Sequence, residues 1–301
     1  MKGLTINSVH FNGLAAIELL TAEVRLVVVI ARGPRIAFLG EPGGANLLYW
    51  APGKHQRGEW DILGGHRVWL TRPGADEPEE TYAPDNGVCS VELHENGVTV
   101  IGALDPVHRL RRGLAVRALA GNRFRVDNFV RNESDMLWSG GLWAITCTVP
   151  GAHSSYVAPL GDGSSWDYTT IVAFRTWGGG HGGVGFADEQ FTTTQDALVL
   201  RPTGRENKRM FKADAGILAL HDPKRGILFA KHAAYQSGGN YPLGTNFALY
   251  VGPDNFMVEM ESMAPVETLK PGQSSVHTET WVLAAATASL PGNAALKQLF
   301  V

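Results

Sequence analysis

Cysteine is scarce in this chain of 301 residues, which has only Cys89 and Cys147. The two lie far apart and form no CxxC pair, so the sequence predicts buried thiols rather than a disulfide. Metal-binding spacing is also lacking, because none of the ten histidines forms an HxxxH or HxH pair. We therefore expect no metal site.

Phosphate-binding and nucleophile motifs are missing as well. The sequence has no GxSxG turn, no GxxxxGK[ST] loop and no GxGxxG between a strand and a helix. The glycine-rich stretch at 178–183 contains no lysine and precedes no helical pattern, so it predicts a flexible loop. No cofactor is expected.

Long apolar runs and a strong net charge are lacking too. The most apolar run, Leu26–Ala31, lies between Arg25 and Arg32 and is far too short to cross a bilayer. No cationic start with an apolar stretch and a cleavage site is present. The net charge of -3 gives no general attraction to nucleic acid or anionic membranes. We expect a cytoplasmic protein without nucleic-acid or membrane partners.

Short strands and turns dominate the pattern that is present. Glycine (36 residues) and proline (16) are spread along the chain, which is typical of many short elements. The Asn96-Gly97 turn predicts a hairpin, and two more are predicted around 120–122 and 221–226. Only Leu14–Leu20 and Ala294–Phe300 look helical. No linker divides the chain, so we expect one all-β domain over 1–301, a large antiparallel β-sandwich with more than half of its ordered residues in strands.

The first candidate site segment is Gly64-Gly65-His66-Arg67-Val68-Trp69-Leu70, followed beyond an acidic loop by Asn86. Paired glycines allow close approach to a ligand, and the planar fork of Arg67 suits hydroxyls or a carboxylate. The competing interpretation is a β-bulge with a surface arginine.

The second candidate is the segment that contains Glu259 and Glu261. In a strand both side chains lie on the same face, and two neighbouring carboxylates raise one pKa, which suits proton transfer. Alternatively, both carboxylates face solvent.

Cations and tryptophans late in the chain form a third group of candidates. For any single cation, a solvated strand edge is the favoured interpretation. We expect about two of the eight tryptophans to line a site, and the rest to fill the core. The cations are Lys208, Arg209, Lys212, Lys231 and His232.

The order of these segments resembles the aldose 1-epimerase, or galactose mutarotase-like, superfamily. The resemblance covers nearly the whole chain, from strands like 23–30 and 35–40 to Val258-Glu259 followed by Leu269-Lys270-Pro271-Gly272. More narrowly, the chain resembles the bacterial branch called DUF4380. The resemblance implies the family's large β-sandwich, an open sugar-binding cleft and a glutamate base, with Glu259 and Glu261 as equal candidates.

The sequence departs from the family at the acid. Where mutarotases carry a histidine in the middle of the chain, this sequence has Trp143, so His66, His153, His181, His232 or a lysine would have to replace it. Two alternatives therefore stay open: a non-catalytic sugar-binding protein, and a lyase or hydrolase on the same scaffold.

The expected ligand is a small carbohydrate. If Arg67, Lys212 and Lys231 converge beside His66 and His232, a carboxylate or phosphate on the sugar would relieve their repulsion, which favours an acidic sugar. The competing interpretation pairs the lysines with Asp214, Asp222 or the strand glutamates.

Overall fold

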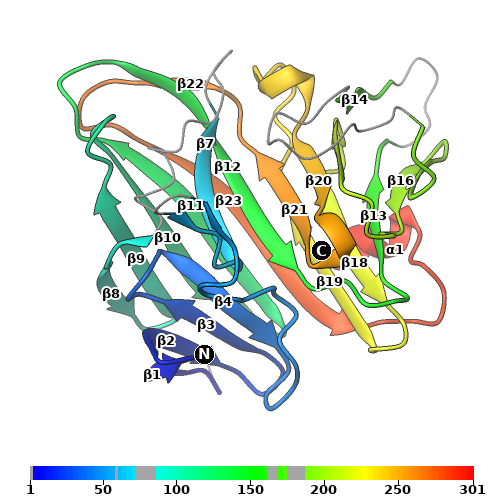
Figure 1. The fold of residues 1–301 in the computed structure, drawn as a ribbon, viewed down its shortest axis with the longest axis horizontal. Coiled ribbons are helices and arrows are strands. Elements are labelled where there is room, and N and C mark those ends of the chain that lie inside the picture. Colours follow the sequence, from blue (N-terminus) through cyan, green and yellow to red (C-terminus); the bar gives the residue numbers. More distant parts are fainter. Residues whose placement is uncertain (1–2, 58–59, 72–85, 162–167, 175–186) are drawn as a thin grey trace.

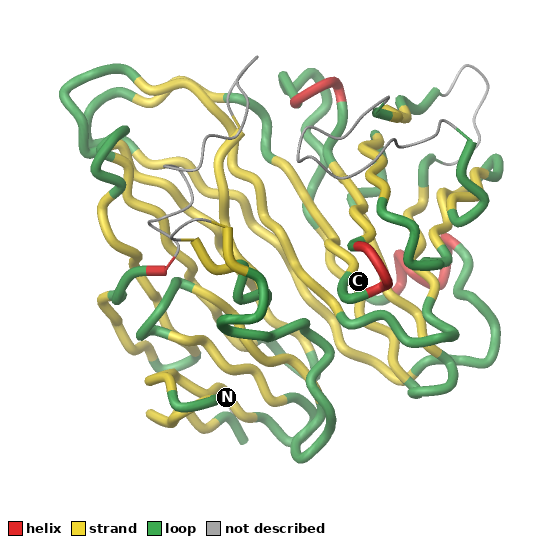
Figure 2. The backbone as a smooth tube through the Cα atoms, viewed as in Figure 1, coloured by secondary structure: helices red, strands yellow, loops and turns green. Residues whose placement is uncertain are grey.

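Two large antiparallel sheets make up most of the protein (Figure 1). The computed structural model describes residues 3–57, 60–71, 86–161, 168–174 and 187–301. Among the described residues, strands account for 53% and helices for 5%, and Figure 2 shows how few and short the helical segments are. The predicted all-β sandwich with more than half of its ordered residues in strands is therefore confirmed.

The first sheet has 11 strands in the order β1-β2-β3-β4-β7-β12-β21-β20-β17-β14, with β22 paired to β12. Its strands are β1 Thr5–Phe11, β2 Leu14–Leu20, β3 Arg25–Val29, β4 Arg35–Gly40, β7 His66–Thr71, β12 Trp138–Thr148, β14 Ile171–Ala173, β17 Asn207–Phe211, β20 Phe247–Val251, β21 Val258–Met263 and β22 Glu267–Leu269.

The second sheet has 10 strands in the order β15-β16-β13-β18-β19-β23-β11-β10-β9-β8. Its strands are β8 Ser90–His94, β9 Gly97–Leu104, β10 Leu110–Ala118, β11 Arg123–Asn132, β13 Ser155–Pro159, β15 Phe191–Thr193, β16 Ala197–Leu200, β18 Ile217–Asp222, β19 Ile227–His232 and β23 Ser274–Ala285. The remaining elements are the small β5–β6 ribbon (Gln56–Arg57, Trp60–Asp61), the short helices η3 Pro242–Gly244 and η4 Pro253–Asn255, and α1 Asn293–Gln298.

The main core lies between the two sheets, because alternate residues of each strand point to opposite faces. On β21, for example, Val258 and Met260 join the main apolar cluster with Leu249 of β20 and Trp281 of β23. Smaller apolar clusters cover the outer faces, including one over β7, β12, β20 and β21 and one under α1. Both faces of the central strands are therefore buried.

The three predicted hairpins are confirmed as β8–β9, β10–β11 and β18–β19. The predicted C-terminal helix is α1, with slightly different bounds. The helical interpretation of Leu14–Leu20 is wrong, because this segment is β2, hydrogen-bonded between β1 and β3. Pairing with two neighbouring strands overrides the weak local preference of an apolar run without a turn signal.

The paired glycines bring the chain close to itself. Gly64 and Gly65 have φ values of +90° and +71°, and a Cβ would lie 2.2 Å from the Tyr49 carbonyl oxygen and 2.4 Å from that of Ile36. Only glycine combines this backbone with such close contacts. The close approach expected at this position is therefore to backbone of the same chain.

The two cysteines are not joined by a disulfide, and Cys147 is buried while Cys89 is half-buried. Within the described ranges, no helix has the length and apolar character needed to cross a membrane.

Candidate functional site

Glu259 and Glu261 lie on the same outer face of β21, as their spacing predicts. In the register of the sheet, Cys147 and Tyr250 flank Glu259, and Ile145 flanks Glu261 on the β12 side. Glu261 is fully buried and Glu259 nearly so, at 0% and 8% exposure. The alternative in which both carboxylates face bulk solvent is therefore wrong.

Each carboxylate has a cation reaching it from a different strand. Arg67 Nη2 on β7 lies 3.3 Å from Glu259 Oε1, and Lys208 Nζ on β17 lies 2.8 Å from Glu261 Oε2. Both cations are almost completely buried, with 3% of each side chain exposed. The four formal charges cancel, which is what allows them to occupy a face shielded from water.

Glu261 is held by one of its oxygens only. The Trp143 indole nitrogen donates to Oε2 at 2.8 Å, as Lys208 does, whereas Oε1 is buried without a hydrogen-bond partner. Burial raises the pKa of Glu261 above its usual value, Lys208 opposes this shift, and Glu259 adds to it. A buried carboxylate oxygen that lacks a donor is energetically costly, and a water or a ligand hydroxyl that reached Oε1 would relieve this cost.

Aromatic rings border the carboxylates on one side. Trp69 and Trp143 meet edge to face at 5.8 Å, with Arg67 stacked on Trp69 at 4.2 Å and Lys208 above Trp143 at 4.5 Å. Stacking on cations and on each other fixes the two indoles. Trp69 and Trp143 therefore lie on the carboxylate face, and the expectation that tryptophans line a ligand site stays a prediction.

Another aromatic group borders the opposite side, beyond Cys147. Tyr49 hydrogen-bonds through its backbone to Cys147, and its ring contacts Phe256 at 5.4 Å, which in turn contacts His55 at 4.6 Å. Tyr49 Oη and His55 Nε2 are buried without a partner, like Glu261 Oε1. Burial raises the pKa of the Cys147 thiol to about 12, so it is not a nucleophile near neutral pH.

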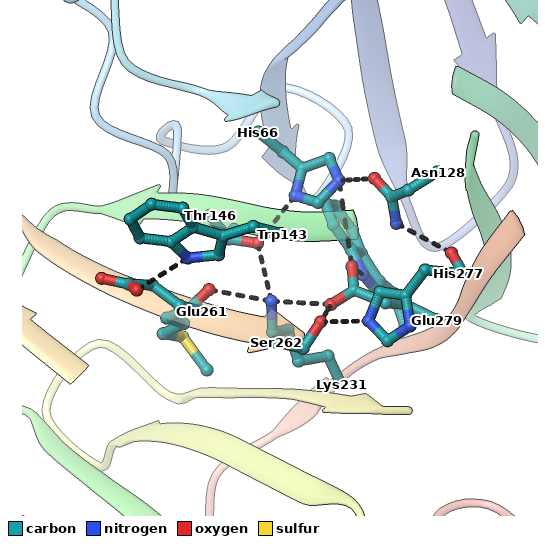
Figure 3. A network of polar contacts seen from close by, with 11 residues as sticks. His66, Asn128, Trp143, Thr146, Lys231, Glu261, Ser262, His277 and Glu279 are labelled. Carbon is teal, nitrogen blue, oxygen red and sulfur yellow. Dashed lines mark hydrogen bonds and ion pairs between the residues drawn. The ribbon is translucent and has the colours of Figure 1, made fainter. Parts of the chain in front are cut away.

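His66 and Lys231 lie on the opposite face, in the core between the sheets (Figure 3). Lys231 Nζ donates to Glu279 Oε1 at 2.7 Å, to the Met260 carbonyl at 2.8 Å and to Thr146 Oγ1 at 3.2 Å. All three ammonium hydrogens are thus used. We call this cluster the inter-sheet network; it consists of His66, Asn128, Thr146, Lys231, Ser262, His277, Glu279 and Trp281.

Hydrogen bonding fixes the proton positions of His66. Its Nε2 lies 2.9 Å from Asn128 Oδ1, which can only accept, so Nε2 carries the hydrogen. Its Nδ1 then accepts from Thr146 Oγ1 at 2.8 Å. Burial lowers the pKa of His66 to about 4, so the ring is neutral at neutral pH. Among the described residues, the polar partners of His66 are Thr146, Asn128 and Glu279 in the core, on the other face of the sheet from Glu259 and Glu261, and its catalytic role stays a prediction.

The other predicted ligand residues also lie apart from the carboxylates. Lys212 pairs with Asp214 at 3.1 Å, and the amide of Asn86 donates to the Asp61 carbonyl at 3.4 Å. His232 ends β19 and its ring contacts Phe300 at 5.3 Å on the outer face of the second sheet. The expected convergence of Arg67, Lys212 and Lys231 is therefore wrong, because each has a carboxylate partner in a different place.

Two further histidines, His153 and His181, are alternatives for the acid. His153 is exposed in the turn before β13, and His181 lies outside the described residues.

Lys208 is the residue of this face whose importance the sequence reasoning missed. The solvated-edge interpretation is wrong for Lys208 and Lys231, which are 3% and 0% exposed. The alternation of β17 indicates that Lys208 is buried, because its side chain lies on the same face as that of Met210, which belongs to an apolar cluster. The same alternation does not reveal that β17 pairs with β20.

No group of three or more histidine, cysteine, aspartate or glutamate side chains with metal-binding geometry occurs in the part of the chain that the structure describes.

Comparisons with known proteins place the fold but not the activity. No protein-family model and no curated protein matches the sequence, so the narrower DUF4380 resemblance stays a prediction. Among solved structures, a galactose mutarotase-like protein from Lactobacillus casei matches with a TM-score of 0.62 and 12% identity, over 89% of this chain and 99% of that one. A proposed aldose 1-epimerase from Klebsiella pneumoniae matches with a TM-score of 0.62 and 13% identity, over 98% and 86% of the two chains.

A longer protein shares the fold in part. The chain covers 48% of a TPR-domain-containing protein from Parabacteroides distasonis, which matches 92% of this chain with a TM-score of 0.59 and 12% identity. At such low sequence identities the likeness establishes the fold, and any activity has to be argued from the site itself. The chain has the galactose mutarotase-like fold.

Proposed function

We propose that the protein binds a sugar at the outer face of β7, β12 and β21 and interconverts its anomers, as an aldose 1-epimerase does. The observation that carries this proposal is the Glu261 carboxylate, buried with a raised pKa and with Oε1 lacking a donor. A sugar hydroxyl would supply that donor. A carboxylate with a raised pKa is also suited to accept and return a proton near neutral pH.

The reaction needs one base and one acid. Glu261 Oε1 takes the proton of the anomeric hydroxyl while an acid protonates the ring oxygen, the bond between the anomeric carbon and that oxygen breaks, and the open aldehyde forms. Return of both protons after rotation about the neighbouring carbon–carbon bond closes the other anomer. Lys208, 2.8 Å from Glu261 Oε2, is the candidate acid, and Arg67 orients Glu259 beside it.

The charge balance of this face favours a neutral sugar. Arg67 is neutralised by Glu259 and Lys208 by Glu261, so an additional carboxylate or phosphate would introduce an unbalanced buried charge. A hydroxyl-rich ring needs only donors and acceptors, and Tyr49 Oη and His55 Nε2 add two buried polar atoms without partners.

A non-catalytic sugar-binding protein is the second candidate. It is favoured by Trp143, which occupies the position where the resemblance implies an acidic histidine and whose indole cannot give up a proton. Both candidates predict sugar binding, and only the first predicts accelerated anomer exchange.

Replacing Glu261 with Gln tests the proposal. The amide keeps the shape and removes the base, so we expect anomer exchange to slow by about a hundredfold or more, with sugar binding largely kept. Exchange is measured by polarimetry on glucose, galactose and xylose. Because burial raises the pKa of Glu261, wild-type activity should fall on acidification at a pH above the usual glutamate range, since the protonated carboxyl is no base.

Glu18→Gln is the matched control, because it makes the same substitution at another carboxylate paired with an arginine, Arg25 at 2.7 Å, on β2 and outside the face of β7, β12 and β21. Sugar binding without exchange by the wild type would favour the second candidate. Activity that Glu261→Gln leaves intact would exclude Glu261 as the base.

A further inference from the structure

We propose that a second site, on the outer face of the other sheet, binds an acidic sugar such as a uronate. A cavity of about 390 Å³ lies there, lined by Arg111, Phe129, Arg131 and Glu133 together with Ser90 and Ser274. It is formed by β8, β9, β10, β11 and β23, none of which contributes to the face that bears Glu261. This inference is therefore independent of the proposed epimerase activity.

An aromatic ring forms part of this cavity. Phe129 on β11 faces Gly113 on β10, and a Cβ at Gly113 would lie 2.1 Å from the ring atom Cζ. The ring thus crosses the backbone of β10 in the space that any other residue at 113 would fill. Phe129 stays half-buried, and its neighbour across the strand pair, Val276, is 54% exposed. An open aromatic ring beside exposed apolar surface suits stacking on the C–H face of a ring-shaped ligand.

Two arginines of the cavity lie directly opposite each other on neighbouring strands. Arg111 and Arg131 are cross-strand partners, an arrangement of like charges that is unfavourable for a sheet. Arg111 is neutralised by Glu133 through two hydrogen bonds of 2.8 and 3.0 Å, which raise the pKa of the guanidinium. The Arg131 side chain is exposed and forms no hydrogen bond or ion pair with the residues that the structure describes. Glu133 also attracts Arg131 electrostatically, but the cavity holds two guanidinium groups and one carboxylate, so one positive charge is in excess.

These features specify the ligand's chemistry. A guanidinium holds a carboxylate through two parallel hydrogen bonds, so Arg131 would bind the anionic group. Phe129 would stack on an attached apolar ring face, and the serine hydroxyls and the partly exposed Glu133 would bind ring hydroxyls. A uronate carries all three kinds of group, whereas glucose lacks the carboxylate and inorganic phosphate lacks the ring.

The test titrates glucuronate, glucose and inorganic phosphate against the Arg131 Nε–Hε NMR signal, which reports binding at this cavity and not glucose bound at the Glu261 face. Isothermal titration calorimetry measures the glucuronate affinity of the variants. We expect glucuronate to bind at least about tenfold more tightly than the other two and to shift that signal. Arg131→Gln and Phe129→Leu should each weaken glucuronate binding by about tenfold. Arg125→Gln is the matched control, since Arg125 lies on the same strand and face but outside the cavity, paired with Asp127 at 2.9 Å.

Several results would overturn the proposal. These are an Arg131 signal that glucose or phosphate shifts at the same concentrations as glucuronate, glucuronate affinity unchanged in both cavity variants, or an equal loss in Arg125→Gln. Glu261→Gln should leave the Arg131 signal and its response to glucuronate unchanged. Failure at either site is thereby distinguished from failure at the other.

Discussion

Replacing Lys231 with Met is expected to lower the free energy of unfolding by about 3–5 kcal/mol, because it leaves a buried carboxylate without its counter-charge. Lys231 and Glu279 are both 0% exposed and lie 2.7 Å apart. The attraction of Lys231 is a main reason why the pKa of Glu279 falls to about 2 although burial acts to raise it. Without the ammonium group, the hydrogen-bond donors that the carboxylate keeps among the described residues are neutral, Ser262 and the Trp281 indole.

The comparison that isolates this effect uses two further variants. Lys231→Met combined with Glu279→Gln removes both charges and should recover a large part of the loss. Lys212→Met removes the more exposed pair with Asp214, whose carboxylate side chain is 39% exposed, and should cost less than about 1 kcal/mol. Urea unfolding followed by circular dichroism measures all three. Equal losses in Lys231→Met and Lys212→Met would contradict the stabilising role of the inter-sheet network.

The same network also supports the strand that carries the candidate base. Lys231 donates to the carbonyl of Met260, the residue between Glu259 and Glu261. Thr146, another partner of Lys231, lies between Ile145 and Cys147, which flank the two glutamates. The inter-sheet network and the carboxylate face thus lie on opposite sides of β12 and β21. The hydrogen bonds of the network hold in place the two strands whose other face carries the carboxylates and their neighbours.

Strand alternation explains what the sequence could predict about the site. It correctly placed Glu259 and Glu261 together, because they are two residues apart in one strand. The same rule separates His66 from Arg67, which are adjacent in β7 and must point to opposite faces. The expectation that these two would act on one ligand overlooked that rule.

Long-range pairing explains what could not be predicted. Lys208 reaches Glu261 because β17 pairs with β20, and β20 with β21, an order that no local pattern in residues 207–263 reveals. Likewise, Glu279 meets Lys231 because β23 pairs with β19, and it meets His66 because β7 belongs to the facing sheet. Hairpins were predictable because their turn residues are local, whereas the strand order determines which charges meet.

Acidification from pH 6.5 toward 4 is expected to destabilise the protein steeply, by about 2 kcal/mol per pH unit near pH 5 from two histidines alone. Burial lowers the pKa values of His66 and His277 to about 4, although Glu279 acts to raise both and Lys231 acts to lower both. Arg67 lowers the pKa of His66 further. Since the unfolded chain binds protons at these rings from about pH 6.5 downward while the folded protein does not, unfolding takes up close to two protons near pH 5.

Glu279 extends this loss to lower pH. Its folded pKa of about 2 lies below the usual 4.5, so its contribution to stability is complete above pH 4.5 and disappears as the pH falls toward 2.

The histidine contribution is measured by urea unfolding at pH 6.5, 5.5 and 5.0. His277→Asn and His66→Gln should each reduce the slope of stability against pH by about one proton. His153→Asn, which replaces an exposed histidine outside the network, is the matched control. If neither core replacement changes the slope of stability against pH, the two rings take up protons alike in the folded and the unfolded chain, and the prediction is wrong. We expect the opposite because both rings are buried and hydrogen-bonded within the inter-sheet network.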